Sequence, residues 1–335
     1  MRRINVATFG VGVIGSLTAK HVLEEREDRL NLVGAFDVDP TKVGKDIGDV
    51  VGLGRRTGVK VSDRLADVLT KDVDVAIHAT SSFLTQTYSQ IESIVDYGVD
   101  VVSSCEELSY PYVVNRRLSN KLDLLAKKKG ATVLGTGINP GFLMDALPIV
   151  LTTPCKDVRK VTVTRRMNAA TRRIPFQKKI GAGMTEKEFE TAIKEKRISG
   201  HVGLEQSIAM IADAVGWKIG KIKVGRVEPV IAESPAKNDS VRIPSGRVLG
   251  VKQAAVGTAD GAVKIELNFM AYVGSEEEYD LVEIDGTPPV NCKISPCVHG
   301  DHGTIAMLVN MIPKVVSSAP GLYTMKDIQL PSASL

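Results

Sequence analysis

Aromatic residues and cysteines are scarce in this chain of 335 residues. Phe, Trp and Tyr make up 4% of the sequence, so Val, Ile, Leu, Ala and Met have to build the core. Four cysteines are too few for a disulfide scaffold, and this favours a reducing cytoplasm as the location. They are Cys105, Cys155, Cys292 and Cys297.

Long apolar runs and a strong net charge are missing as well. No stretch reaches 18 apolar residues and the N-terminus has no hydrophobic signal segment, so neither a membrane partner nor secretion is expected. The net charge is +4 and the basic runs are short, which does not favour nucleic acid as a partner. The length predicts about two domains of an ordinary globular protein.

The sequence does contain a glycine-rich turn between an apolar strand at 4–9 and an amphipathic helix at 16–25. In Gly10-x-Gly12-x-x-Gly15 the first glycine permits a tight turn, the second leaves room for a pyrophosphate, and the third lets the helix pack against the strand. A second strand at 31–36 ends in Asp37, where a carboxylate can hold the adenosine ribose. This order predicts a nicotinamide dinucleotide site. Its residues in the turn are Gly10, Gly12, Val13, Ile14 and Gly15.

Apolar strands and helical patterns alternate over the first part of the chain. This alternation predicts an α/β domain at 1–145, with a Rossmann-type, doubly wound parallel sheet. Further strands are expected at 73–79, 99–104 and 131–135, a weaker one near 59–61, and helices at 85–97 and 113–128.

Beyond Pro148 the strands become longer and more alternating, which predicts a second, α+β domain with a mainly antiparallel sheet at 146–302. A capping box at Thr185–Glu188 opens a helix that runs to Lys196, and another helix covers 203–217. Residues 303–335 are expected to pack back on the first domain, with an apolar helix at 304–316 that Pro313 kinks or ends. The strands of the second domain are expected at 157–168, 219–232, 247–257, 262–273 and 279–285.

Polar residues follow several strands of the predicted parallel sheet, whose carboxyl ends are where ligands bind. The hydroxyl groups at 80–82 could bond the nicotinamide ribose, or they could cap the next helix. Asn139 lies in a loop with three glycines, where its amide could bond the cofactor or the substrate. The cofactor candidates at these strand ends are Thr80, Ser81, Ser82, Ser104, Cys105 and Asn139.

Two pairs of charged residues are candidates for chemistry on the substrate. Glu106 and Glu107 follow a strand of the sheet, so a carboxylate there would lie near the nicotinamide and serve as general base. The structural alternative is that they interact with the dipole of a helix that starts there. Arg172 and Arg173 could clamp a carboxylate, or they could lie in a basic surface loop.

Two further chemistries are not favoured. Cys292-x4-Cys297-x-His299-x2-His302 offers zinc ligands at a spacing that matches no usual zinc motif. No metal is therefore expected, and the histidines are expected to cap the last helix or edge the substrate cleft. Cys105 could be a thiol nucleophile, but its acidic neighbours would raise its pKa.

Five segments, at 10–15, 104–111, 135–145, 172–181 and 299–304, together resemble a known family. Through them the chain resembles the 2,4-diaminopentanoate dehydrogenases and the native amine dehydrogenases, which in turn look like dihydrodipicolinate reductases. Those reductases carry a paired-histidine and lysine motif in the substrate domain. This sequence has no His-His pair, which disfavours their activity.

The resemblance implies NAD(P)-dependent oxidative deamination of an amine that is not alpha to a carboxylate, reversible as reductive amination, in a homodimer built through the second domain. The favoured reaction converts 2,4-diaminopentanoate to 2-amino-4-oxopentanoate and ammonia. A glutamate of the Cys-Glu-Glu loop is implied as the base, and the likeness of this loop to the Cys-Glu-Lys-Pro loop of glucose-fructose oxidoreductase relatives favours Glu107 over Glu106. The candidate substrate residues are Asn139, Arg172, Arg173, Gln177 and His299.

The sequence leaves alternatives open for both the activity and the cofactor. A broad-specificity dehydrogenase of simple amines would need no carboxylate clamp, and an NAD-sensing protein would bind the dinucleotide without turnover. Asp37 favours NAD because it repels a 2′-phosphate. Lys42, Arg55 and Arg56 could offset that repulsion, so NADP could serve as well.

Overall fold

The computed structural model describes residues 2–172, 174–237 and 242–333. The chain forms two compact units, which are described separately below. Unit 1 comprises Met1–Phe142 and His299–Leu335, and unit 2 comprises Leu143–Val298. The corresponding sequence-based boundaries are 145/146 and 302/303.

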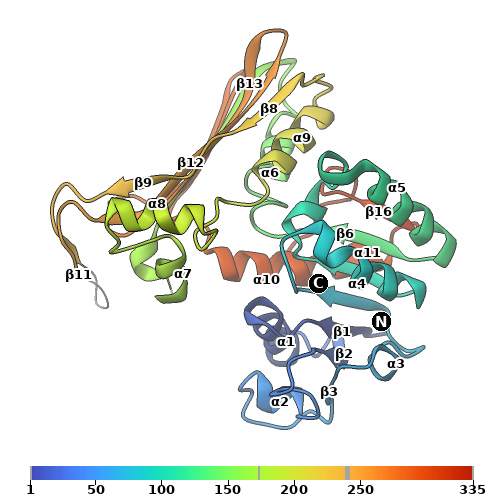
Figure 1. Ribbon diagram of the computed structural model, residues 1–335. Helices are drawn as coiled ribbons and strands as arrows, with labels where there is room; N and C mark the ends of the chain where they lie inside the picture. The colour runs from blue at the N-terminus through green and yellow to red at the C-terminus, as the bar shows by residue number, and fades with distance from the viewer. Residues whose placement is uncertain (1, 173, 238–241, 334–335) are drawn as a thin grey trace. The chain divides into compact units, whose positions relative to one another are not determined.

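Unit 1 is built on a parallel sheet of seven strands in the order β16-β6-β5-β4-β1-β2-β3 (Figure 1). The chain leaves this unit after β6 and returns to add its last helices and the edge strand β16, which pairs with β6. The Rossmann-type prediction is confirmed. The strands are β1 (Ile4–Phe9), β2 (Leu30–Phe36), β3 (Val61–Ser62), β4 (Val75–His78), β5 (Asp100–Ser103), β6 (Thr132–Gly135) and β16 (Gly321–Tyr323).

Helices cover both faces of this sheet. On one face α4 and α5 pack on β5 and β6 and bury apolar side chains such as Ile91, Ile94 and Leu122. On the other face α1 packs against α10, and α11 packs on β5 and β6. The helices of unit 1 are α1 (Val13–Glu25), α2 (Ile47–Val50), α3 (Leu65–Val68), α4 (Leu84–Asp96), η1 (Glu106–Ser109), α5 (Tyr112–Lys129), α10 (Gly300–Asn310) and α11 (Ile312–Val316).

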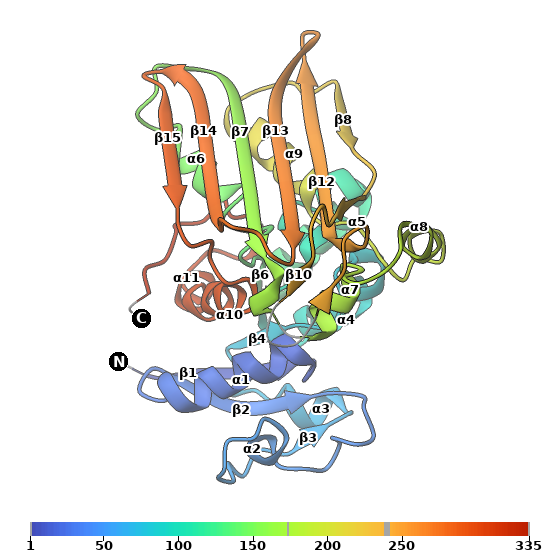
Figure 2. The same ribbon diagram turned by 90° about the vertical axis from the view of Figure 1, so that its left-hand side faces the viewer.

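Unit 2 contains a second sheet of seven strands, in the order β15-β14-β7-β13-β12-β8 with β9 also paired to β12 (Figure 2). The pairing of β7 with β13 is parallel and the other pairings are antiparallel, so the sheet is mixed but mostly antiparallel. The strands are β7 (Asp157–Asn168), β8 (Lys221–Val224), β9 (Glu228–Ile231), β12 (Val248–Ala259), β13 (Ala262–Tyr272), β14 (Tyr279–Thr287) and β15 (Val290–Ile294).

One face of this second sheet is covered by α6 (Ala146–Leu151) and α9 (Leu204–Ala214). The strict alternation along β7, where Val161 and Val163 are buried and Thr162 and Thr164 are half-buried, sends the apolar set to that face. Toward one end of the sheet lie α7 (Ile174–Lys179), α8 (Glu186–Lys194) and the short hairpin of β10 (Ala236–Lys237) and β11 (Arg242–Ile243). The expected capping box opens α8, because Thr185 and Glu188 exchange both bonds.

Three expectations need correction. The strand expected at 219–232 is two strands, because residues 225–227 stand opposite only two residues of β12 and interrupt the pairing. A Cβ atom on Gly225 would lie 2.8 Å from the carbonyl oxygen of Ala254. The strand β15 was not expected. The last helix begins at Gly300 and breaks at Met311, and Pro313 lies in the first turn of α11, where its missing N–H costs nothing.

In the described ranges, no helix has the length and apolarity needed to cross a membrane.

Candidate functional site

The glycine turn forms a cradle at the start of α1. Gly10 has a φ of +92°, and a Cβ atom on it would lie 2.7 Å from the carbonyl oxygen of Ala79. A Cβ atom on Gly15 would lie 1.8 Å from the carbonyl oxygen of Gly10, so only glycine allows this contact between helix and turn. Gly12, the N-cap of α1, faces open space. The first N–H groups of the helix, at Val13 and Ile14, are therefore available to an anion in that space, and a dinucleotide pyrophosphate fits it.

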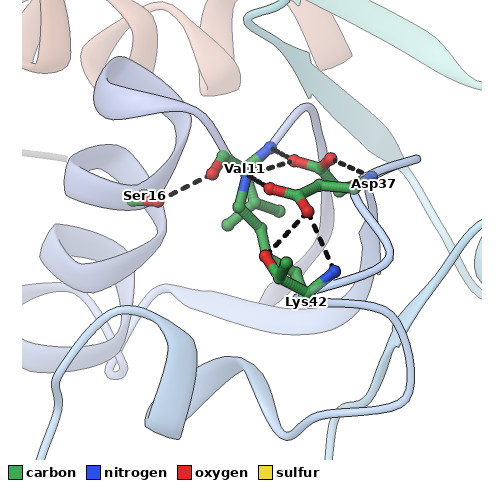
Figure 3. A network of polar contacts seen from close by, with 6 residues as sticks. Val11, Ser16, Asp37 and Lys42 are labelled. Carbon is green, nitrogen blue, oxygen red and sulfur yellow. Dashed lines mark hydrogen bonds and ion pairs between the residues drawn. The ribbon is translucent and has the colours of Figure 1, made fainter.

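Asp37 closes the same turn from the end of β2. Its carboxylate accepts hydrogen bonds from the N–H of Val11 at 2.7 Å and of Asp39 at 2.9 Å, and Lys42 Nζ lies 3.2 Å away (Figure 3). Burial raises the pKa of Asp37, but these two N–H groups and Lys42 together hold it below its ordinary value. Asp37 is therefore charged and fixed in place.

A cavity of about 490 Å³ opens beside Gly10 and Gly12. Asp37 and Thr80 also line it, so four of the predicted cofactor residues share one space. Within the described chain Ser81, Ser82, Ser104, Cys105 and Asn139 do not line this cavity. The remaining lining residues are Phe9, Phe36, Val38, Leu65, Ala79, Ser89, Gln90 and Ser93.

Sequence reasoning missed the polar side of α4 that lines this cavity. The helical spacing of Ile91 and Ile94 identifies the buried face of α4, and therefore the opposite polar face that carries Ser89, Gln90 and Ser93. Nothing in that pattern indicates that the polar face borders a cavity rather than solvent.

The strand ends at this edge of unit 1 are joined by a continuous row of backbone hydrogen bonds. Gly10 N–H donates to Phe36 at 2.8 Å, and Ala79 N–H donates to Phe9 at 2.9 Å. The row continues from Ser104 N–H to His78 at 3.0 Å and from Thr136 N–H to Ser103 at 2.8 Å. The glycine turn, the hydroxyl segment, the acidic loop and the Asn139 loop therefore follow neighbouring strands of one sheet.

The acidic loop is attached to the start of α4. The carboxylate of Glu107 accepts the N–H of Leu84 at 2.6 Å, and the backbone N–H of Glu107 donates to the carbonyl oxygen of Ser82 at 3.1 Å. The hydroxyls at 80–82 do not cap this helix, because its N-cap is Phe83 and Thr80 and Ser81 donate instead to Gln90 and Gln86. Glu107 thus takes the capping role that was one interpretation of those hydroxyls.

Cys105 is a buried, protonated thiol. Burial, followed by weaker contributions that include the charges of Glu106 and Glu107, raises its pKa to about 11. Its Sγ donates to the carbonyl oxygen of Ser82 at 3.3 Å and accepts from Thr87 at 3.4 Å. The expected direction of the pKa is confirmed, and this environment does not activate a nucleophile.

The loop of Asn139 is compact and is attached to α10. Gly141 has a φ of +124°, and a Cβ atom on it would lie 2.4 Å from the N atom of Gly137. Ile138 N–H donates to Thr304 Oγ1 at 3.4 Å. The ring of His299 caps α10 by accepting the N–H of His302 at 3.4 Å, which confirms the capping interpretation of this histidine.

In unit 2 the predicted arginine pair is only partly visible, because Arg173 lies outside the described residues. Arg172 is half-buried, and its Nη1 is enclosed without a hydrogen-bond partner among the residues that the structure describes. Gln177 donates its amide N–H to the carbonyl oxygens of Arg172 at 2.8 Å and Ala170 at 3.4 Å, which leaves its buried Oε1 without a partner there. Arg172 is therefore not a solvated surface residue.

The cysteine and histidine segment forms no metal centre in the described part of the chain, where no three His, Cys, Asp or Glu side chains are grouped closely enough to hold an ion. Cys297 donates instead to Glu278 Oε2 at 3.2 Å, and burial raises its pKa to about 11. Cys292 lies on β15.

Comparisons with known proteins match a family model to each part of the chain. Residues 142–335 match the 2,4-diaminopentanoate dehydrogenase C-terminal domain, and residues 4–105 match the dihydrodipicolinate reductase N-terminus. A 2,4-diaminopentanoate dehydrogenase from Acetoanaerobium sticklandii is 34% identical over 99% of this chain and 95% of its own. An amine dehydrogenase from Streptomyces virginiae is 22% identical over 98% of this chain and 96% of its own.

Solved structures share the fold. The amine dehydrogenase from Mycobacterium smegmatis superposes with a TM-score of 0.82 at 27% identity, covering 99% of this chain and 97% of that one. The WlbA dehydrogenase from Bordetella pertussis, solved with NADH, reaches a TM-score of 0.55 at 14% identity, covering 97% of this chain and 92% of that one. The fold is that of NAD(P)-binding dehydrogenases.

Proposed function

Since this chain belongs to the 2,4-diaminopentanoate dehydrogenase family and is thereby an amine dehydrogenase, we propose that it uses NAD(P) to deaminate an amine that is not alpha to a carboxylate. The proposed reaction converts 2,4-diaminopentanoate to 2-amino-4-oxopentanoate and ammonia, and runs in reverse as reductive amination. The observation that carries it is the row of hydrogen bonds between strand ends, by which the Gly12 cradle and the acidic loop both follow the carboxyl ends of strands in the sheet of unit 1.

In this proposal Glu107 is the base. The bound nicotinamide cofactor supplies the hydride acceptor. The substrate ammonium gives a proton to the carboxylate, because only a neutral amine has the lone pair that expels a hydride. Glu107 then releases this proton to solvent, takes one from the water that adds to the iminium carbon, and returns it to the nitrogen, so that ammonia leaves. One carboxylate oxygen is held by Leu84 N–H, so the other carries the proton. Glu106 is the alternative, since it stands in the same loop.

The proposed carboxylate site involves unit 2. Arg172 Nη1 is a buried cationic donor without a partner among the described residues, which suits a carboxylate. Gln177, Arg173, Asn139 and His299 remain proposed substrate residues. Asn139 also remains a proposed cofactor residue. Recognition of a carboxylate is what would separate a diamino acid from simple amines.

For the cofactor we propose NAD first and NADP second. Asp37 is charged, and its carboxylate would meet the 2′-hydroxyl of NAD favourably and a 2′-phosphate unfavourably. Lys42 neutralises part of that charge at 3.2 Å, which supports dual use.

The proposed homodimer forms through unit 2. Along β7 and β13 the residues that alternate with the buried ones, such as Thr162, Asn268 and Met270, are half-buried and lie on the sheet face opposite α6 and α9. A second copy would cover that face. The molar mass in solution, measured by light scattering during gel filtration, should be that of two chains, and the mass of one chain would reject the dimer.

The test of the reaction is reduction of NAD and NADP by the purified protein with racemic 2,4-diaminopentanoate, with ammonia measured in the same samples. Equal amounts of reduced cofactor and ammonia support the proposal. The likeness to amine dehydrogenases favours a second candidate, oxidation of simple amines, and equal rates with 2-aminopentane would select it. Cofactor binding without turnover of any amine would instead indicate an NAD sensor.

A further inference from the structure

A buried polar chain lies beneath the cavity of unit 1. His78, the last residue of β4, is fully buried. Its Nδ1 lies 2.8 Å from Ser103 Oγ, and its Nε2 lies 2.9 Å from Gln90 Oε1. Thr80 donates to the same Gln90 oxygen at 2.7 Å, and Cys105 N–H donates to Ser103 Oγ at 3.1 Å. Gln90 and Thr80 are the two members that line the cavity.

The donors and acceptors of this chain have one consistent order. Burial lowers the pKa of His78 to about 4, so the ring is neutral and carries one N–H. Ser103 Oγ already accepts the N–H of Cys105, so its O–H donates to His78 Nδ1. The hydrogen of His78 is therefore on Nε2, which lies within reach of Gln90 Oε1 and, at 3.0 Å, of Thr80 Oγ1. The opposite tautomer would place two donors, His78 and Cys105, on Ser103 Oγ and leave the Ser103 hydroxyl with no acceptor in the described chain.

This order fixes the orientation of the Gln90 amide. Both His78 and Thr80 donate to Oε1, so the NH₂ group must occupy the other position of the amide. Gln90 Nε2 has no hydrogen-bond partner in the part of the chain that the structure describes, and the side chain borders the cavity. The amide thus has two free N–H donors, on a residue that lines the same cavity as Asp37 and Gly12.

We propose that Gln90 is a binding residue for the dinucleotide, donating its amide N–H groups to oxygen or nitrogen acceptors of the adenosine half, and that His78 is the positioning residue that holds it in that orientation. This inference rests on the proposed NAD(P) chemistry and adds two residues to it. A neutral donor at this place assists NAD and NADP alike, whereas Asp37 separates them.

The first test measures the dissociation constant of NADH by fluorescence titration. Gln90→Glu keeps an acceptor for His78 and Thr80, but it removes the N–H donors and adds a negative charge, so NADH should bind about tenfold or more weakly. Gln90→Ala should weaken binding about threefold to tenfold.

Asn120→Asp is the matched control, since it makes the same change from amide to carboxylate at an exposed position of α5. It should leave NADH binding unchanged. If Gln90→Glu binds NADH within about twofold of the parent protein, the inference is wrong while the NAD(P) proposal stands. If the parent protein binds neither NADH nor NADPH, both are wrong.

The role of His78 is tested by a double-mutant cycle. His78→Leu should weaken NADH binding in the parent protein and have no further effect in the Gln90→Ala protein, because it acts through Gln90. Ser103→Ala, which removes only the hydroxyl that sets the tautomer, gives the same comparison with a smaller disturbance should the leucine variant fail to fold. Equal losses in both backgrounds would show that His78 is merely structural.

Discussion

The polar groups that line the cavity of unit 1 and those around Arg172 in unit 2 differ in their hydrogen bonding. Around the cavity of unit 1, Asp37, Thr80 and the Gln90 oxygen are bonded to the chain itself. In unit 2, within the described ranges, Arg172 Nη1 and Gln177 Oε1 are buried without hydrogen-bond partners. His201 Nε2 is also buried without a partner there. The His201 ring stacks on Phe269 with 4.5 Å between the ring centroids, and burial lowers the pKa of His201 to about 3.

This difference teaches how the proposed ligands would be bound. Groups held by the chain cost little to organise when a nucleotide arrives, so the nucleotide side is prepared in advance. A buried polar group without a partner costs about 1–3 kcal/mol. In the proposed function these groups of unit 2 would gain partners when a polar substrate enters, and they would then be the sharper source of substrate discrimination.

The largest expected effect belongs to the acidic loop. Glu107→Gln should lower kcat about 10²- to 10⁴-fold, because the amide cannot take the ammonium proton. Its carbonyl oxygen can still accept Leu84 N–H, so NADH binding should be kept. The measurement is steady-state kinetics with an NADH titration alongside. Glu106→Gln is the matched variant, and loss of turnover there with an active Glu107→Gln protein would move the base to Glu106.

Arg172→Met comes next and tests the substrate side. The KM for 2,4-diaminopentanoate should rise about 10- to 100-fold, because a charged hydrogen bond to the carboxylate is lost. The KM for 2-aminopentane should not change. Arg226→Met is the control, since that side chain is 88% exposed. Equal increases in KM for both amines would contradict a carboxylate role for Arg172 and, with it, the proposed difference between the two units.

A smaller effect is expected at the nucleotide side. Asp37→Ser should shift the ratio of NADPH to NADH affinity about tenfold toward NADPH, because the charge that repels a 2′-phosphate is gone. Asp39→Ser removes the other carboxylate beside Lys42 and keeps Asp37, so it should leave the ratio unchanged. Fluorescence titrations with both reduced cofactors measure this. An unchanged ratio in Asp37→Ser would show that Asp37 does not face the ribose.

The smallest effect concerns stability and lies at Asp100, the first residue of β5, at the amino end of the strands of the same sheet. Burial, with a further contribution from Asp74, raises the pKa of Asp100 to about 6 despite the hydrogen bond that it accepts from Thr132 N–H. A carboxyl group whose pKa is raised by folding stabilises the protein at low pH, and this stability is lost as the pH rises from about 4 through about 6. Asp100→Asn keeps the acceptor for Thr132 and removes the charge.

The asparagine variant should therefore unfold with a free energy about 1–2 kcal/mol higher than the parent protein at pH 8 and equal to it near pH 4. Urea unfolding at the two pH values measures this, and kcat should not change. A variant that is less stable at pH 8 would mean that the charged form of Asp100 is stabilised by the fold.

Much of the fold could be predicted because local patterns decide it. The apolar strands at 4–9 and 157–168 have the predicted bounds, and the box at Thr185 and Glu188 opens a helix as expected. The strand β15 was missed because it has only five residues and they are partly exposed. The break between β8 and β9 depends on their register with β12, which sequence spacing does not reveal.

The candidate site divides in the same way. The glycine turn is a local motif, and its geometry follows from residue spacing alone. The bond from Glu107 to Leu84 and the chain through His78 depend on which strand ends are neighbours, which is a property of the sheet order. Gln90 shows the limit most clearly, because its sequence pattern indicates only a polar helix face.

The return of the chain to unit 1 has a consequence for biosynthesis and for engineering. Residues 1–142 are synthesised well before α10, α11 and β16, so the first sheet lacks an edge strand and part of one covering layer until residues 299–335 have been made. A gene fragment that stops after Phe142 should therefore yield an aggregation-prone product. The missing strand and helices come from residues 299–335, so the junctions at 142 and 299 define where a different second unit could be grafted.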